Sequence, residues 1–130
     1  MAQQLIIPHE LPALNQTIEA GKRHWSEYAV LKRRYTALVV ALARRQLCPI
    51  RSGRVHLSFV WFCRNRRKDP DNISSAGRKI ILDGLVSAGI LQDDGWKQVS
   101  SFSDSFEVDK AHPRVEVTID EICDNEEHAC

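Results

Sequence analysis

The run of residues 54–63 constrains the fold more than any other part of this chain. Alternate residues of the run form one wholly apolar face, made of Val55, Leu57, Phe59, Trp61 and Cys63. The opposite face begins polar and becomes apolar, in the order His56, Ser58, Val60 and Phe62. A period of two residues is that of a β-strand, and a half-apolar second face indicates partial cover. We therefore expect a strand near the centre of a small sheet.

Helices are expected on both sides of this strand. Apolar residues three and four apart predict an amphipathic helix over 24–45. A second helix follows the strand, runs to about residue 88 and has Gly89 at its C-cap. Residues 10–23 are polar and contain Pro12 and Gly21, so we expect a loop there.

Three further segments have the pattern of strands. Residues 4–9 end near Pro8 and are expected at a sheet edge. Residues 96–108 are polar and favour a second edge, and residues 114–122 alternate between apolar and polar. The element order is β-α-β-α-β-β. This order predicts an α/β fold with a small mixed sheet and two main helices.

The 130 residues suffice for one domain, which we expect to span 1–122, followed by a disordered acidic tail over 123–130. No apolar run approaches the roughly 20 residues that cross a bilayer, and no secretory signal is visible. We therefore expect a cytoplasmic protein with no membrane partner and with reduced cysteines. Cys123, His128 and Cys130 make only a weak zinc pattern.

The net charge of +1 conceals two segments of opposite charge. Residues 22–68 hold 13 Lys and Arg side chains against one acid, a net charge of +12. Residues 104–130 hold two basic side chains against nine acids, a net charge of −7. This asymmetry favours a cationic face for a polyanion, with two solvated faces as the alternative. For DNA, the expected backbone contacts are Lys22, Arg23, Lys32, Arg33, Arg34, Arg64, Arg66, Arg67 and Lys68.

Two pairs of aspartates flank the second helix. Asp69 and Asp71 follow the central strand, and Asp93 and Asp94 follow the helix. If both turns reach one end of the sheet, the carboxylates repel one another unless a cation neutralises them. Hard oxygen ligands select Mg²⁺, with Mn²⁺ as a substitute, and such ions suit phosphodiester hydrolysis. The alternative for residues 69–72 is a turn before an N-capped helix, because Asp, Pro and Asn favour turns.

Other phosphate and metal motifs are excluded. A calcium loop beginning at Asp69 would have Ile73 at its fifth position and Ile80 at its twelfth, where oxygen ligands are needed. Glycine-rich phosphate loops and the Gly-x-Ser-x-Gly motif are absent from the sequence. The aspartates therefore remain the candidates for metal chemistry.

Three motifs occur together within residues 60–99. They are Lys68-Asp69-Pro70-Asp71-Asn72, Arg78-Lys79-Ile80-Ile81-Leu82-Asp83-Gly84-Leu85 and Ala88-Gly89-Ile90-Leu91-Gln92-Asp93-Asp94. In combination they resemble the RusA family of Holliday junction resolvases, which are common in phages and prophages. The resemblance implies a RusA-like fold and a homodimeric, magnesium-dependent endonuclease that resolves four-way DNA junctions by paired symmetric nicks. A two-fold dimer suits such a junction, because the junction is itself roughly two-fold symmetric.

The resemblance also implies roles for individual residues. Asp69, Asp71 and Asp94 match the catalytic carboxylates of the family, and Asp93 is the expected further metal ligand.

The catalytic lysine is less directly matched. In the family it lies four residues after the second aspartate, where this chain has Ser75. Counting back from the Asp-Gly-Leu motif points to Lys79 instead, with Lys68 as the second choice.

Three alternatives remain open from the sequence. The first is a less selective nuclease that acts on flaps or forks. The second is a DNA-binding module whose carboxylates are structural. The third is an interaction protein whose acidic tail docks a partner.

Overall fold

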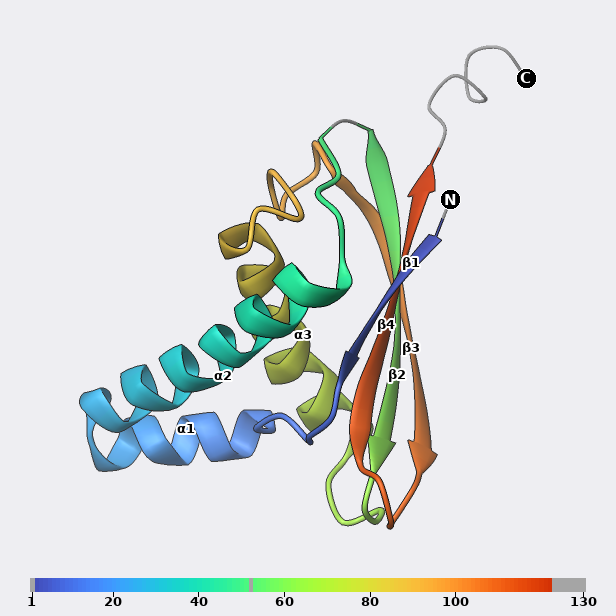
Figure 1. Cartoon of the computed structure of the whole chain (residues 1–130). Coiled ribbons are helices and arrows are strands. Elements are labelled where there is room, and N and C mark those ends of the chain that lie inside the picture. Colours follow the sequence, from blue (N-terminus) through green and yellow to red (C-terminus); the bar gives the residue numbers. More distant parts are fainter. Residues whose placement is uncertain (1, 52, 123–130) are drawn as a thin grey trace.

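A computed structural model describes residues 2–51 and 53–122, except for the side chains of residues 14, 15, 17, 23 and 25 (Figure 1). The described chain forms one mixed sheet and three helices. The elements are β1 (Ala2–Ile7), α1 (Leu14–Arg23), α2 (Trp25–Gln46), β2 (Arg54–Cys63), α3 (Pro70–Ser87), β3 (Val99–Val108) and β4 (Arg114–Ile122). The expected α/β class with a small mixed sheet is confirmed, and α2 and α3 are the two main helices.

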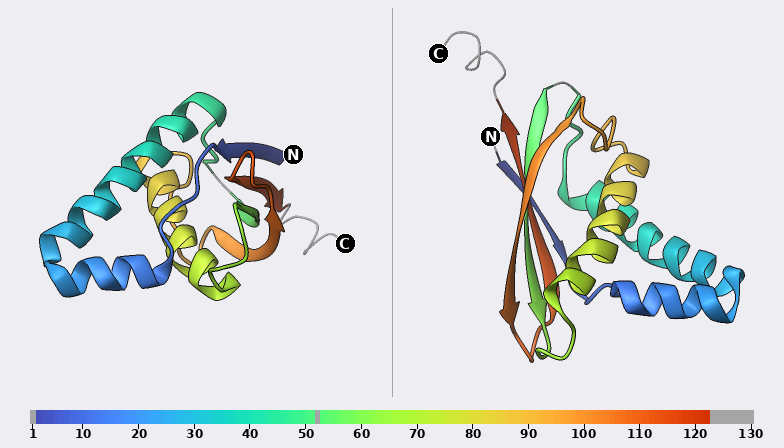
Figure 2. Two further views of the ribbon diagram at one scale, coloured as in Figure 1. Left: turned by 90° about the horizontal axis from the view of Figure 1, so that it is seen from below. Right: turned by 180° about the vertical axis from the view of Figure 1, so that it is seen from behind.

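The strands lie in the order β1-β4-β2-β3. β4 pairs antiparallel with both β1 and β2, whereas β3 pairs parallel with β2. The helices cover one face of the sheet and leave the other face open, as both views in Figure 2 show. α3 is the crossover between the parallel strands, so it runs from the C-terminal end of β2 back to the N-terminal end of β3 (Figure 1).

The prediction of a central strand over 54–63 is confirmed at both bounds. All five residues of its apolar face are at most 8% exposed, and the opposite face is half-buried. The rings of Phe59 and Trp61 stack with centroids 5.5 Å apart. Around them the core takes in β1, β4, α2 and α3, with Leu5, Ile7, Val39, Ile80, Ile81, Leu85, Val115, Val117 and Ile119.

Residues 14–23 are helical, and the expected loop over 10–23 is wrong over this stretch. Pro12 lies two residues before Leu14, the first residue of α1, and therefore does not interrupt the helix. The side-chain oxygen of Gln16 accepts a hydrogen bond from the N–H of Ala13 at 2.8 Å, which closes the first turn. Gly21 lies near the C-terminal end of α1, where its cost to a helix is small.

Two strand bounds also differ from the expectation. β1 begins at Ala2 and ends at Ile7, because Pro8 cannot donate to the sheet. β3 begins at Val99 rather than at residue 96, since the carbonyl of Gly95 accepts bonds from the N–H groups of Gln98 and Val99 and forms a turn. The expected edge positions of both strands are confirmed.

A half-buried polar cluster joins α3 to β3. The indole Nε1 of Trp61 donates to Asp104 at 2.8 Å, and Arg78 of α3 donates to the same carboxylate at 3.2 Å. The guanidinium of Arg78 also lies 4.3 Å from the ring centroid of Phe102. These contacts hold the cationic side chain of Arg78 over β3, the edge strand of the sheet.

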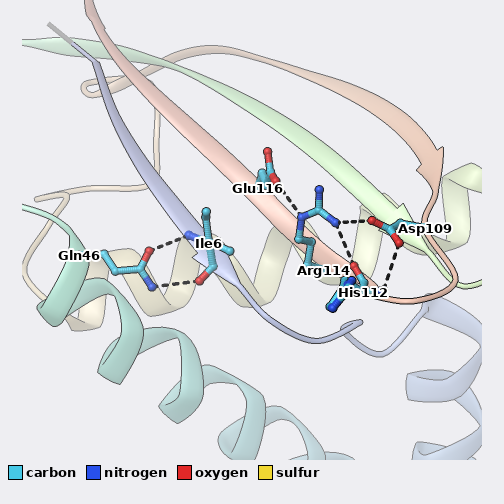
Figure 3. A network of polar contacts seen from close by, with 6 residues as sticks. All are labelled: Ile6, Gln46, Asp109, His112, Arg114 and Glu116. Carbon is cyan, nitrogen blue, oxygen red and sulfur yellow. Dashed lines mark hydrogen bonds and ion pairs between the residues drawn. The ribbon is translucent and has the colours of Figure 1, made fainter.

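Figure 3 shows two sets of polar contacts, one between α2 and β1 and one at the turn between β3 and β4. The side-chain amide of Gln46 exchanges bonds of 2.8 and 3.0 Å with the N–H and carbonyl of Ile6 in β1. At the β3–β4 turn, Arg114 donates to Asp109 at 2.7 Å and to Glu116 at 2.8 Å. The bond from Arg114, followed by that from the N–H of His112, lowers the pKa of Asp109 below its ordinary value.

We expect Gly84→Ala to lower the free energy of unfolding by about 1–3 kcal/mol, which is the usual cost of overpacking. A Cβ atom at Gly84 would lie 2.5 Å from Val39 Cγ1, so α2 and α3 would have to separate. Urea denaturation followed by circular dichroism measures the effect. Gly21→Ala is the matched control, because a Cβ there would meet only Tyr28 at 4.0 Å. Equal losses in both variants would contradict the close helix contact.

Candidate functional site

Asp69 and Asp71 lie at the first turn of α3, at the C-terminal end of β2. Asp69 holds the N-cap position and Pro70 follows it, yet the Asp69 side chain caps no backbone N–H. The N-capping alternative therefore accounts for the backbone but leaves the carboxylate unused. Both side chains are exposed, and neither carboxylate has a hydrogen-bond or ion-pair partner among the described residues. They are free to take a ligand.

Asp93 and Asp94 follow the C-terminal end of α3, which is the end opposite to Asp69 and Asp71. The helix has 18 residues, which corresponds to about 27 Å. One copy of the chain therefore separates the Asp69–Asp71 pair from the Asp93–Asp94 pair. Over residues 2–51 and 53–122, no three Asp, Glu, His or Cys side chains form a group that could hold a metal ion.

The structure does bring Lys79 to Asp94. The Lys79 ammonium lies 3.8 Å from Asp94 and 3.1 Å from Asp83. Hydrogen bonding to Asp83, then the charge of Asp83, with a smaller contribution from Asp94, raises the pKa of Lys79 above its ordinary value. Lys32 of α2 reaches Asp83 as well, at 3.5 Å.

Asp83 was missed as a functional candidate. Its spacing of four residues from Lys79 on a helix is the signal that points to the ion pair. Ser75, at the position of the family's lysine, donates its hydroxyl to the carbonyl of Asp71 at 2.7 Å. That bond is a local helix contact and places no cation beside the aspartates.

The basic turn after β2 contacts both the connection between β1 and α1 and the first turn of α1. Arg64, Arg66 and Arg67 are exposed, and Lys68 is half-buried. The Lys68 ammonium donates to Gln16 at 3.2 Å, and Arg64 forms an ion pair with Glu10. These contacts join segments that lie more than 50 residues apart in the chain.

Three adjoining hollows follow this turn, and we call them the cationic groove. Their volumes are about 720, 400 and 340 Å³. Arg64 lines the first and second hollows, and Lys68 lines the second and third. The first also takes in Arg34 of α2, and Asp69 and Glu107 line the third. The cationic groove therefore extends from Arg34 to Asp69, whose carboxylate has no partner among the described residues.

The other expected DNA contacts do not all face the groove. Lys22 and Arg33 are exposed, while the side chain of Arg23 lies outside the described part of the chain. Lys32 and Arg33 line a separate hollow between α2 and α3, together with Asp83. Because residues 32–34 are consecutive on a helix, they point in different directions, and α2 carries cations on more than one side.

Of the two free cysteines that the structure describes, Cys48 is exposed and Cys63 is buried. Cys63 is 8% exposed, which confirms its expected place in the core. Burial, followed by the charge of Glu10, raises the pKa of the Cys63 thiol. The weak zinc pattern at Cys123, His128 and Cys130 falls outside the described residues, as does the tail over 123–130.

Comparisons with known proteins found no matching family model and no matching curated protein. No helix within the described ranges is long and apolar enough to cross a membrane. The functional assignment therefore depends on the residues of this chain and on their geometry.

We expect Asp83→Asn to lower the pKa of Lys79 more than Asp94→Asn does, because Asp83 provides both the closer charge and the stronger hydrogen bond. Titration of the lysine side chain by NMR measures the two shifts. Asp120→Asn, on the open face of the sheet, is the control and should leave this pKa unchanged. A larger shift for Asp94→Asn would contradict the arrangement.

Proposed function

We propose that this protein is a magnesium-dependent endonuclease for branched DNA, similar to the RusA resolvases. The observation that carries the proposal is the cationic groove, which is lined by Asp69, a carboxylate without a partner in the described part of the chain. Cationic grooves bind the phosphate backbone without regard to sequence. A carboxylate at the end of such a groove can hold a metal ion against a phosphate that the cations have positioned.

The donor set of Asp69 and Asp71 fits Mg²⁺. Mg²⁺ prefers hard oxygen ligands and is usually held by one or two carboxylates together with water and substrate phosphates. Asp94 and Asp93 are the further ligands in the proposal, and Mn²⁺ would substitute. When bound, the ion would lower the pKa of an attacking water and stabilise the leaving oxygen.

The basic residues would bind and orient the DNA. Arg64 and Arg67 are exposed at the rim of the groove and can follow successive phosphates. Lys68 is held by Gln16, so its ammonium has a defined position one residue before Asp69. Lys79 remains protonated beside Asp94 and can contact a phosphate oxygen there.

The remaining parts of the proposal follow from the resemblance. The substrate is a four-way junction cut by paired nicks, the enzyme is a homodimer, and the site of action is the cytoplasm. Forks and flaps are the substrates of the less selective alternative.

We expect the wild-type protein to nick a synthetic four-way junction in Mg²⁺ and Asp71→Asn to be at least about 100-fold slower, because a metal ligand is lost. Gel electrophoresis of end-labelled junctions measures the products. Asp120→Asn is the control, since it lies on the open sheet face, at the far end of β2 from Asp71. Equal cleavage by wild type and Asp71→Asn would refute the site. Metal-independent binding with no product would favour the DNA-binding module.

We expect Arg64→Gln and Arg67→Gln each to weaken junction binding by several-fold and to reduce the slope of log affinity against log salt by about one unit. Fluorescence anisotropy without divalent metal measures binding separately from cleavage. Arg51→Gln is the control, because Arg51 is exposed in the loop before β2, at the opposite end of that strand. An equal loss for Arg51→Gln would mean that net charge alone, and not the groove, governs binding.

A further inference from the structure

Trp96 is the most exposed of the large apolar side chains in the described part of the chain, at 93%. It lies in the connection between α3 and β3, shortly after Asp93 and Asp94. A tryptophan ring in water forgoes the free energy that its burial would bring, and such rings are enriched at binding surfaces. The protein therefore presents a large flat ring within three residues of two proposed metal ligands.

The turn that carries Trp96 is held in place by the side chain of Gln98, which is 4% exposed. The Oε1 atom of Gln98 accepts hydrogen bonds from the N–H groups of Gln92 and Asp93, at 2.6 and 3.1 Å. Its Nε2 atom donates to the carbonyl of Ile50 at 3.1 Å. Because the backbone is fixed on both sides of Trp96, the ring can bind a ligand with little loss of backbone freedom.

The surroundings of Trp96 favour a nucleobase over a protein as its ligand. Within residues 47–50 and 84–100, two segments joined by the bond from Gln98, Trp96 is the only large apolar side chain that is exposed. A protein interface surrounds its central aromatic residues with further apolar contacts. Lys97 is exposed beside the ring, and Lys79 lies 3.8 Å from Asp94. A single aromatic ring close to cations is typical of proteins that bind single-stranded nucleic acid.

We propose that Trp96 stacks on an unpaired base of bound DNA, beside the Asp93–Asp94 pair. The proposal rests on the proposed function, which brings DNA to these aspartates, and it specifies the substrate further. A base of a continuous duplex must first leave the helix, which costs free energy, whereas single-stranded arms and branch points offer a base at lower cost. Trp96 would therefore select branched or single-stranded DNA over continuous duplex.

One strand can reach the ring and the proposed phosphate contact together. Two peptide units separate the Cα atoms of Asp94 and Trp96, so these atoms lie at most about 7 Å apart. A phosphate held by Lys79 beside Asp94 would leave a neighbouring base within reach of Trp96. Every base has a π face, so the contact would hold the strand without reading its sequence.

Tryptophan fluorescence tests the stacking directly. The full-length protein is titrated with oligothymidylate in the absence of divalent metal, so that binding is measured without cleavage. The DNA should quench the emission of the wild type, and Trp96→Leu should remove this quenching. Trp61 is 2% exposed and cannot stack, and Trp25 is present in both proteins, so its contribution cancels in the difference. Equal quenching of the two proteins, or wild-type emission that the DNA does not change, overturns the proposal.

Fluorescence anisotropy of labelled DNA tests what the ring contributes to selectivity. Trp96→Leu should bind a fork with single-stranded arms about 5- to 100-fold more weakly than the wild type, and its affinity for continuous duplex should change by less than about two-fold. Trp96→Phe should restore most of the affinity for the fork, because it retains a ring. Phe102→Leu is the control, since it also removes an exposed aromatic ring, and it should bind both DNAs as the wild type does. Circular dichroism confirms that the variants are folded.

Three results of the anisotropy measurement would overturn the proposal. They are an equal loss of affinity for fork and duplex, a Trp96→Phe variant that binds no better than Trp96→Leu, and an equal loss in Phe102→Leu. Cleavage assays separate this proposal from the proposed function. Stacking without nicking of a junction in Mg²⁺ would refute the nuclease and leave the stacking standing. Nicking by a wild type whose emission DNA does not change would overturn the stacking and leave the nuclease standing.

Discussion

The close packing of α3 against its neighbours is the constraint on which the rest of the structure depends. A Cβ at Gly77 would lie 2.6 Å from the ring of Trp61, and one at Gly84 would lie 2.5 Å from Val39. Glycine at these two places lets α3 lie directly on β2 and on α2. Because α3 is the crossover that joins the adjacent parallel strands β2 and β3, it also determines which end of the sheet each aspartate pair follows.

The cationic groove depends on a second set of contacts, between residues distant in sequence. Glu10 in the β1–α1 connection contacts Arg64, and Gln16 in α1 contacts Lys68, both in the turn after β2. Each contact is partly exposed and contributes little stability by itself. Their effect is one of position: the Lys68 ammonium bonds to Gln16, and the neighbouring Asp69 carboxylate has no ion-pair partner among the described residues. Binding of a polyanion and binding of a metal ion are thereby compatible in the proposed function.

The sequence by itself determined the elements whose signal is local. The alternation over 54–63 identified the central strand, and the polar character of β3 placed it at an edge, because side-chain burial follows a period of two. Residues 14–23 were misread, since polar residues and Gly21 obscure a helix whose first turn is closed by Gln16. Only the tertiary structure decided which aspartates share an end of the sheet and that Lys79 meets Asp83 and Asp94. The physical reason is that these distances depend on the direction of the α3 crossover, which no spacing along the chain records.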